Sequence, residues 1–134
     1  MPANAIGFIC GGNINTRRIC VQDTGNAFSV IQATNATAEP IGISSGETEF
    51  PPGNLQDTNG YAGQTGYTGM RLFQLGEETT VEAGAVFNAG NVMSDTNGRA
   101  IAATTGNWSV GFALQAATAS LQFVTVKIDP GYVR

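Results

Sequence analysis

Histidine is absent from this chain of 134 residues, and charged side chains make up only 12% of it, about half the usual share. The commonest general base at neutral pH is therefore missing. The net charge is −4, and Lys127 is the single lysine, which argues against a nucleic-acid-binding surface. No run approaches the roughly twenty apolar residues of a membrane helix. The first residues lack the basic start of a secretory signal. We expect no nucleic acid and no membrane as partner, and synthesis in a host cytoplasm.

Sequence patterns of enzyme active sites are also missing. No G-x-S-x-G elbow, Ser-x-x-Lys pair or glycine-rich phosphate loop occurs. Solvated loop carboxylates are a simpler interpretation of the acidic residues than a glycosidase pair, and Arg17-Arg18 fits a solvated strand end. We therefore predict that the protein is no enzyme and holds no cofactor and no metal. The acidic residues considered are Glu47, Glu49, Glu77, Glu78 and Glu82.

The two cysteines, Cys10 and Cys20, form no C-x-x-C motif, and no histidine is present to complete a zinc site. Two buried thiols are the favoured interpretation, with a disulfide as the alternative.

Three Asp-containing tetrapeptides punctuate the chain at residues 23–26, 57–60 and 95–98. An EF-type calcium loop requires a glutamate at its twelfth position. Counted from the second and third aspartate, that position is Thr68 or Gly106, so neither loop can close a calcium shell. Asn-Gly adopts positive φ at both central positions of a hairpin turn. The pattern therefore predicts turns between strands.

Apolar residues alternate or form short runs between these turns, and no window has a helical stripe. The sequence predicts an all-β fold with short antiparallel strands and little or no helix. The clearest strand is 121–128, in which Val124, Val126 and Ile128 face one way. A short helical turn at 113–120 remains open. The other expected strands lie at 6–10, 18–22, 27–32, 41–43, 70–75, 92–94, 99–102 and 108–115.

The segment RICVQDTGNAFSVIQATNATAEPIGIS, residues 18–44, is echoed by NVMSDTNGRAIAATTGNWSVGFALQ, residues 91–115. Each reads as strand, turn, strand, Ala-Thr loop and a strand with an apolar-Gly-apolar triplet. Two similar β units are therefore expected within residues 1–134, which we expect to form a single domain.

Two segments look suited to contacts with a partner. Residues 44–69 form a long loop rich in Gly, Pro and Tyr, and loops of this length are usually functional or disordered. Its aromatic residues Phe50, Tyr61 and Tyr67 favour binding. Residues 1–17 form the other segment, an N-terminal arm. Trp108 reads as a core or interface anchor.

Residues 80–128 resemble the small capsid decoration, or cement, proteins of tailed bacteriophages. The resemblance rests on spaced small residues, a "VGFAL" segment and a terminal V-x-V-x-I. The matching positions are Val81, Ala83-Gly84, Ala89-Gly90, Val92, Gly98, Val110-Gly111-Phe112-Ala113-Leu114, Val124, Val126 and Ile128.

The resemblance implies a compact β-barrel or β-tulip domain that sits as a homotrimer on the outer capsid surface of the virion. Its partners would be the major capsid protein and further copies of itself, and its function would be to clamp neighbouring capsid subunits of the expanded head. A low charge suits a protein surrounded by partners. The alternative is a head fibre or a carbohydrate- or receptor-binding β module.

On this interpretation the N-terminal arm adds a strand to a capsid edge, although an ordinary barrel strand explains it equally well. The long loop contributes aromatic anchors. The candidate contact residues are Pro2, Ile6, Phe8, Ile9, Phe50, Tyr61 and Tyr67.

Overall fold

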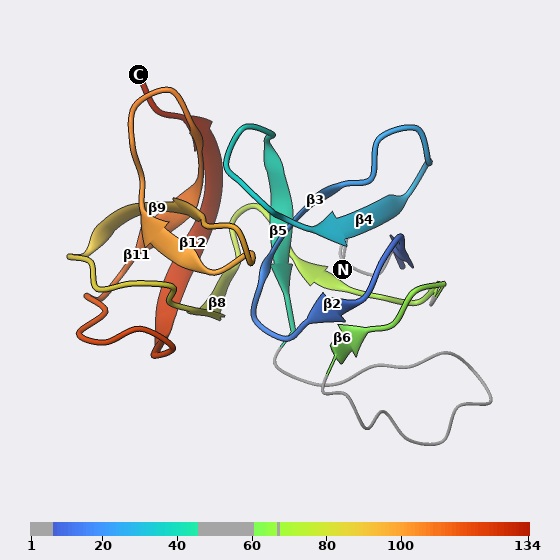
Figure 1. The fold of residues 1–134 in the computed structure, drawn as a ribbon, viewed down its shortest axis with the longest axis horizontal. Helices are drawn as coiled ribbons and strands as arrows, with labels where there is room; N and C mark the ends of the chain where they lie inside the picture. The colour runs from blue at the N-terminus through green and yellow to red at the C-terminus, as the bar shows by residue number, and fades with distance from the viewer. Residues whose placement is uncertain (1–6, 46–60, 67) are drawn as a thin grey trace.

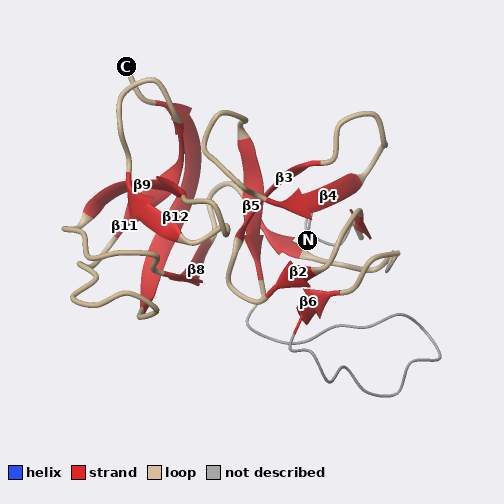
Figure 2. Cartoon of the chain, in the orientation of Figure 1, coloured by secondary structure: helices blue, strands red, loops and turns tan. Residues whose placement is uncertain are grey.

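The structure, a computed structural model, describes residues 7–45, 61–66 and 68–134. Every regular element in these residues is a β-strand, which confirms the predicted all-β fold. Figure 1 and Figure 2 show two groups of strands lying side by side along the long axis of the molecule. We call residues 7–75 the first unit and residues 76–134 the second unit. Whether they count as one domain stays a prediction.

The first unit contains a five-stranded sheet in the order β1-β4-β3-β5-β7 and a separate pair, β2-β6. A bridge between Phe8 and Met70 joins the two ends of the five-stranded sheet, so the sheet curls back on itself. The strands are β1 (Ile9–Cys10), β2 (Ile14–Asn15), β3 (Ile19–Gln22), β4 (Ser29–Gln32), β5 (Pro40–Ser44), β6 (Tyr61–Gly63) and β7 (Leu72–Phe73).

The second unit contains a five-stranded sheet in the order β10-β9-β11-β12-β8. A bridge between Ala83 and Ala100 joins its two ends, and this sheet curls in the same manner. The strands are β8 (Glu78–Glu82), β9 (Gly90–Ser94), β10 (Ala100–Ala102), β11 (Trp108–Ala113) and β12 (Phe123–Tyr132).

The two units share one topology, which confirms the prediction of two similar β units. Each strand pairing of the first unit has a counterpart with the same strand direction in the second unit. The matching pairings are Cys10–Val30 with Ala83–Ala100, Cys20–Gly42 with Val92–Gly111, Ile43–Phe73 with Phe112–Lys127, and Ile14–Gly63 with Phe87–Ala117.

The equivalent glycines Gly42 and Gly111 explain the repeated apolar-Gly-apolar triplet. A Cβ at Gly42 would lie 2.1 Å from the carbonyl oxygen of Phe73, and one at Gly111 would lie 2.1 Å from that of Lys127. Both distances are far inside van der Waals contact. The neighbouring strand therefore approaches so closely that no side chain fits.

The buried side chains form two clusters. One fills the first unit and includes Ile14, Met70 and both cysteines. The other fills the second unit and extends across to Ile19 and Ile43 of the first. Burial of apolar surface therefore stabilises each unit and also holds the two together.

Hydrogen bonds add to the contact between the units, which we call the seam. Ile19 N donates to Gly98 O at 2.8 Å, Glu82 N to Arg17 O at 3.0 Å and Trp108 N to Ala36 O at 2.8 Å. These bonds satisfy backbone groups that would otherwise be buried without partners.

Both Asp-containing turns in the described residues connect paired strands, as predicted. In the β9–β10 turn, Asp95 Oδ1 accepts from the backbone N–H of Asn97 at 2.7 Å and of Arg99 at 2.9 Å. Gly98 has φ of 74°, but Asn97 is not among the residues with positive φ. The expectation of positive φ at both Asn97 and Gly98 is therefore wrong, because the aspartate carboxylate organises the loop instead. The third tetrapeptide, residues 57–60, lies outside the described residues.

Several element boundaries differ from the sequence prediction. Residues 113–120 contain no helical turn; Ala117 pairs with Phe87 instead. The predicted long loop includes strand β6, which pairs with β2. Strand β8 was not predicted, because its sequence ETTVE has only one buried apolar residue, Val81.

Cys10 and Cys20 are buried thiols, which confirms the interpretation favoured from the sequence. The Cys10 thiol donates to the Met70 sulfur at 3.2 Å. Burial raises the pKa of the Cys20 thiol far above its ordinary value, and the nearby Cys10 raises it further. The Cys20 thiol therefore stays protonated and unreactive while the first unit is folded.

Candidate functional site

A charged cluster at the seam contains Arg18, the most buried charged residue among the described residues. Arg18, on the first unit, is 8% exposed and pairs through Nη2 with Glu82 Oε2 at 3.1 Å. Arg99 binds the same carboxylate oxygen, and Arg18 Nη1 donates to Asn97 O at 3.0 Å. The interpretation of Arg18 as a solvated strand end is therefore wrong, because the second unit covers it.

Burial lowers the pKa of the Arg18 guanidinium, and the carboxylate of Glu82 opposes that shift. Arg18 Nε is buried and has no hydrogen-bond partner within the described part of the chain. The cluster fixes how the two units meet. The carboxylate of Glu82 is engaged by two arginines, which favours a structural role for this residue.

The described residues contain no group of three acidic or cysteine side chains arranged to hold a metal ion. Glu47 and Glu49 lie outside them. No described helix is long and apolar enough to cross a membrane.

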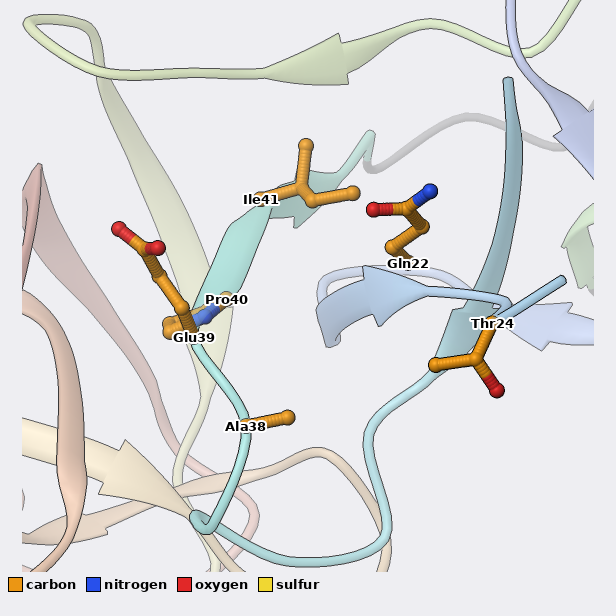
Figure 3. A pocket seen from close by; sticks show the side chains of 6 residues that line it. All are labelled: Gln22, Thr24, Ala38, Glu39, Pro40 and Ile41. Carbon is orange, nitrogen blue, oxygen red and sulfur yellow. The ribbon is translucent and has the colours of Figure 1, made fainter. Parts of the chain in front are cut away.

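A groove of about 450 Å³ lies beside the β3–β4 turn, lined by Gln22, Thr24, Ala38, Glu39, Pro40 and Ile41. Figure 3 shows these side chains, which come from the end of β3 and the turn after it, and from the start of β5 and the loop before it. Glu39 is the single carboxylate in this lining. A lone carboxylate without a second acid or base provides weak support for catalysis.

The largest exposed apolar side chains lie on the turns and outer strand faces. In the first unit, Phe28 is 64% exposed and Ile9 is 39% exposed. Ile9 N donates to Phe28 O at 2.7 Å, so the two residues are neighbours. In the second unit, Phe112 and Leu114 lie two positions apart along β11 and its extension, and both are about half exposed.

Phe28 also has φ of 58°, a left-handed conformation that costs free energy for an aromatic residue. Strained conformations are concentrated at functional sites. An aromatic ring that is both strained and exposed is therefore a candidate contact residue.

Three of the contact residues predicted from the sequence are described. Phe8 is half-buried, and its backbone exchanges two hydrogen bonds with Met70, at 2.7 and 3.1 Å. Ile9 forms β1 and pairs with Ser29. Tyr61 is half-buried in β6 and pairs with Asn15. Phe8 and Ile9 thus lie together within the first sheet, while Tyr61 belongs to the separate strand pair.

The remaining predicted contact residues, Pro2, Ile6, Phe50 and Tyr67, lie outside the described residues. Sequence reasoning did not single out Phe28 and Phe112 as candidate contact residues. The signal for Phe112 was its position after Gly111, and the signal for Phe28 was its position immediately after a turn.

Trp108 is half-buried and packs edge-on against Tyr132, with ring centroids 5.6 Å apart and an angle of 68° between the planes. Its backbone N–H is one of the bonds across the seam. These contacts fit the anchor role expected from the sequence.

No protein-family model matches this sequence, and no curated protein is similar to it. Among solved structures, the chain is similar to the head fibre gp8.5 N base of bacteriophage phi29, with a TM-score of 0.51 and 17% sequence identity. The match covers 92% of this chain and 91% of the other. The two proteins therefore share a fold over nearly their whole lengths.

Proposed function

We propose that this protein is a structural component of a tailed-phage virion and attaches to the outer surface of the expanded head. The main support is the fold shared with the phi29 head fibre base, which extends over 92% of this chain. The resemblance of residues 80–128 to capsid decoration proteins supports the same location. The role is non-catalytic, since the chain has no histidine and Glu82 is engaged by two arginines.

In the first form of this function, the protein is a cement protein that binds the major capsid protein as a homotrimer. A ligand that binds only the assembled lattice stabilises it by RT ln(1 + [L]/Kd) at each site. Three linked copies add avidity, because they engage neighbouring subunits together. The low charged content, 12%, suits a surface that meets mostly other protein.

In the second form, the protein is the base of a head fibre. The solved structure that it resembles is itself such a base, so this form has the more specific structural support. Attachment to the head would be required, but stabilisation of the capsid would not. A carbohydrate- or receptor-binding role is a further candidate, for which the exposed ring of Tyr132 beside Trp108 offers a stacking surface.

Sedimentation with expanded heads that lack surface proteins tests the proposal. We expect the protein to pellet with these heads, to saturate at a fixed number of copies, and to stay in solution without them. Equal pelleting with and without heads would contradict attachment. Heating the complexes then separates the two forms: a cement protein raises the disruption temperature of the head, and a fibre base leaves it unchanged.

The predicted contact segments can be tested in the same assay. Deletion of residues 2–6 leaves β1 in place, and Tyr61→Ala with Tyr67→Ala removes two of the aromatic residues predicted from the sequence to make contacts. Each change is expected to weaken retention on heads at least tenfold, whereas Leu75→Asn, at an exposed turn position, serves as the matched control. Retention equal to that of the control would exclude the altered segment.

A further inference from the structure

The seam inside the chain joins the β9–β10 turn of the second unit to a strand face of the first unit. At the seam, Gly98 of the second unit lies against Ile19 of the first, and Ile19 N donates to its carbonyl at 2.8 Å. A Cβ at Gly98 would lie 3.2 Å from Ile19 O and 3.3 Å from Arg18 Cβ. Ile43, which pairs with Ile19, is fully buried in the cluster shared with the second unit.

Phe28 is the equivalent of Gly98 in the first unit. Val30 and Ala100 occupy matching positions, as the parallel partners of Cys10 and Ala83, and Phe28 and Gly98 each lie two residues earlier. Both have left-handed backbones, with φ of 58° and 74°. Gly98 is buried against the other unit, whereas Phe28 is exposed and has Ile9 beside it. We call Ile9 and Phe28 the donor patch.

The strand face of the first unit that carries Ile19 and Ile43 is covered by the second unit. The second unit has an equivalent strand face. Asn91 and Phe112 pair with one another as Ile19 and Ile43 do. Both second-unit residues are exposed, as is Leu114, which follows on the same face of β11. We call Asn91, Phe112 and Leu114 the acceptor face.

Size and charge are complementary between the patch and the face. The residues before Asn91 are Ala89 and Gly90, where the first unit has Arg17 and Arg18 before Ile19. At the seam, a glycine of the second unit therefore faces arginines of the first. Between the donor patch and the acceptor face, a phenylalanine would face small residues instead. Added atoms at Gly90 would meet open space, so a ring can approach there.

Opposite charges also flank the two surfaces. Lys127 is exposed and pairs with Phe112 on the acceptor face. Asp23 lies on the first unit beside the donor patch, because its backbone N–H donates to Ser29 O next to Phe28. Such complementarity favours one orientation of docking.

We propose that the acceptor face binds the donor patch of a second copy of this chain. The first unit of one copy then covers the second unit of its neighbour, much as the two units cover one another within a chain. The contact is heterologous, and heterologous contacts close into rings when the rotation allows it. This inference specifies the self-association included in the proposed function, but it does not depend on binding to heads.

Light scattering coupled to gel filtration tests the proposal on the isolated protein. The wild type is expected to be a closed oligomer at micromolar concentration. Phe28→Asn removes the ring and places in the left-handed conformation a residue that tolerates it, and Phe112→Thr keeps a strand-favouring residue. Each variant is expected to be a monomer, with at least a tenfold higher dissociation constant. Leu75→Asn should retain the wild-type mass.

Mixing the two variants gives the sharper result. The Phe28→Asn chain keeps an intact acceptor face and the Phe112→Thr chain keeps an intact donor patch, so one sound contact forms and the mixture yields a dimer of one copy each. Circular dichroism of each variant checks its fold, and Leu114→Thr replaces Phe112→Thr if the latter unfolds. A monomeric wild type, variants of wild-type mass, or a mixture that stays monomeric would overturn the proposal.

Discussion

At the scale of single residues, the repeated glycines show how a sequence motif acts through backbone distance. Gly42 and Gly111 occupy equivalent strand positions, and each faces a carbonyl oxygen that would lie 2.1 Å from an added Cβ. The obstruction is backbone of the adjacent strand, which cannot rotate away as a side chain can. The neighbouring strands must therefore separate if either glycine is replaced.

Gly111→Ala is expected to lower the free energy of unfolding by about 2–4 kcal/mol, because the methyl group forces β11 and β12 apart. Urea denaturation followed by circular dichroism measures this change. Gly12→Ala is the matched control, since nothing lies within 4 Å of its Cβ, and its effect should stay below about 1 kcal/mol. Equal effects of the two substitutions would contradict the argument from close approach.

At the scale of elements, the seam joins β3 of the first unit to β8 and the β9–β10 turn of the second. Apolar contacts supply most of the free energy that holds the two units together at the seam. The cluster of Arg18, Glu82 and Arg99 fixes the position of one unit against the other. Desolvation makes a buried ion pair a weak source of net stability. Loss of one partner of the ion pair is strongly destabilising, because the other charge then stays buried without a counter-charge.

Glu82→Gln is expected to destabilise the protein by about 2–3 kcal/mol, because Arg18 loses its counter-charge while it remains buried. The matched control is Glu78→Gln on the same strand, where the side chain is exposed and the change should stay within about 0.5 kcal/mol. Urea midpoints of both variants provide the comparison. If Glu82→Gln is as mild as its control, the cluster does not hold the seam.

At the scale of the whole molecule, the two units have the same topology, and one of the two hydrophobic clusters contains residues of both units. Ile19 and Ile43 belong to the first unit but are buried with the core of the second. Separation of the units would expose these side chains to water. The units are therefore expected to unfold together in one cooperative transition.

Two probes can test this cooperativity, because Trp108 is the single tryptophan and lies in the second unit, while Cys20 is buried in the first. The urea midpoint of tryptophan fluorescence should coincide with the midpoint for labelling of Cys20, measured in a Cys10→Ala background. Labelling of Cys20 at a clearly lower urea concentration would show that the first unit unfolds separately.

Much of the fold follows from local patterns that a sequence displays directly. Alternation in 121–128 identified the strand that buries Val124, Val126 and Ile128, because the strand period of two is a local property. The Asp-containing turns and the echo between 18–44 and 91–115 were visible for the same reason. Strands such as β8, whose apolar content is low, carried no comparable signal.

The sequence alone determined the strand class, the turns and the two-unit plan, since each of these depends on neighbours along the chain. Only the tertiary structure decided that Ile43 is covered while its equivalent Phe112 is exposed, and that Arg18 is buried rather than solvated. Burial depends on what packs against a residue from distant parts of the chain. No local pattern encodes that contact, and for this reason the candidate surface emerged only when the two units were compared in space.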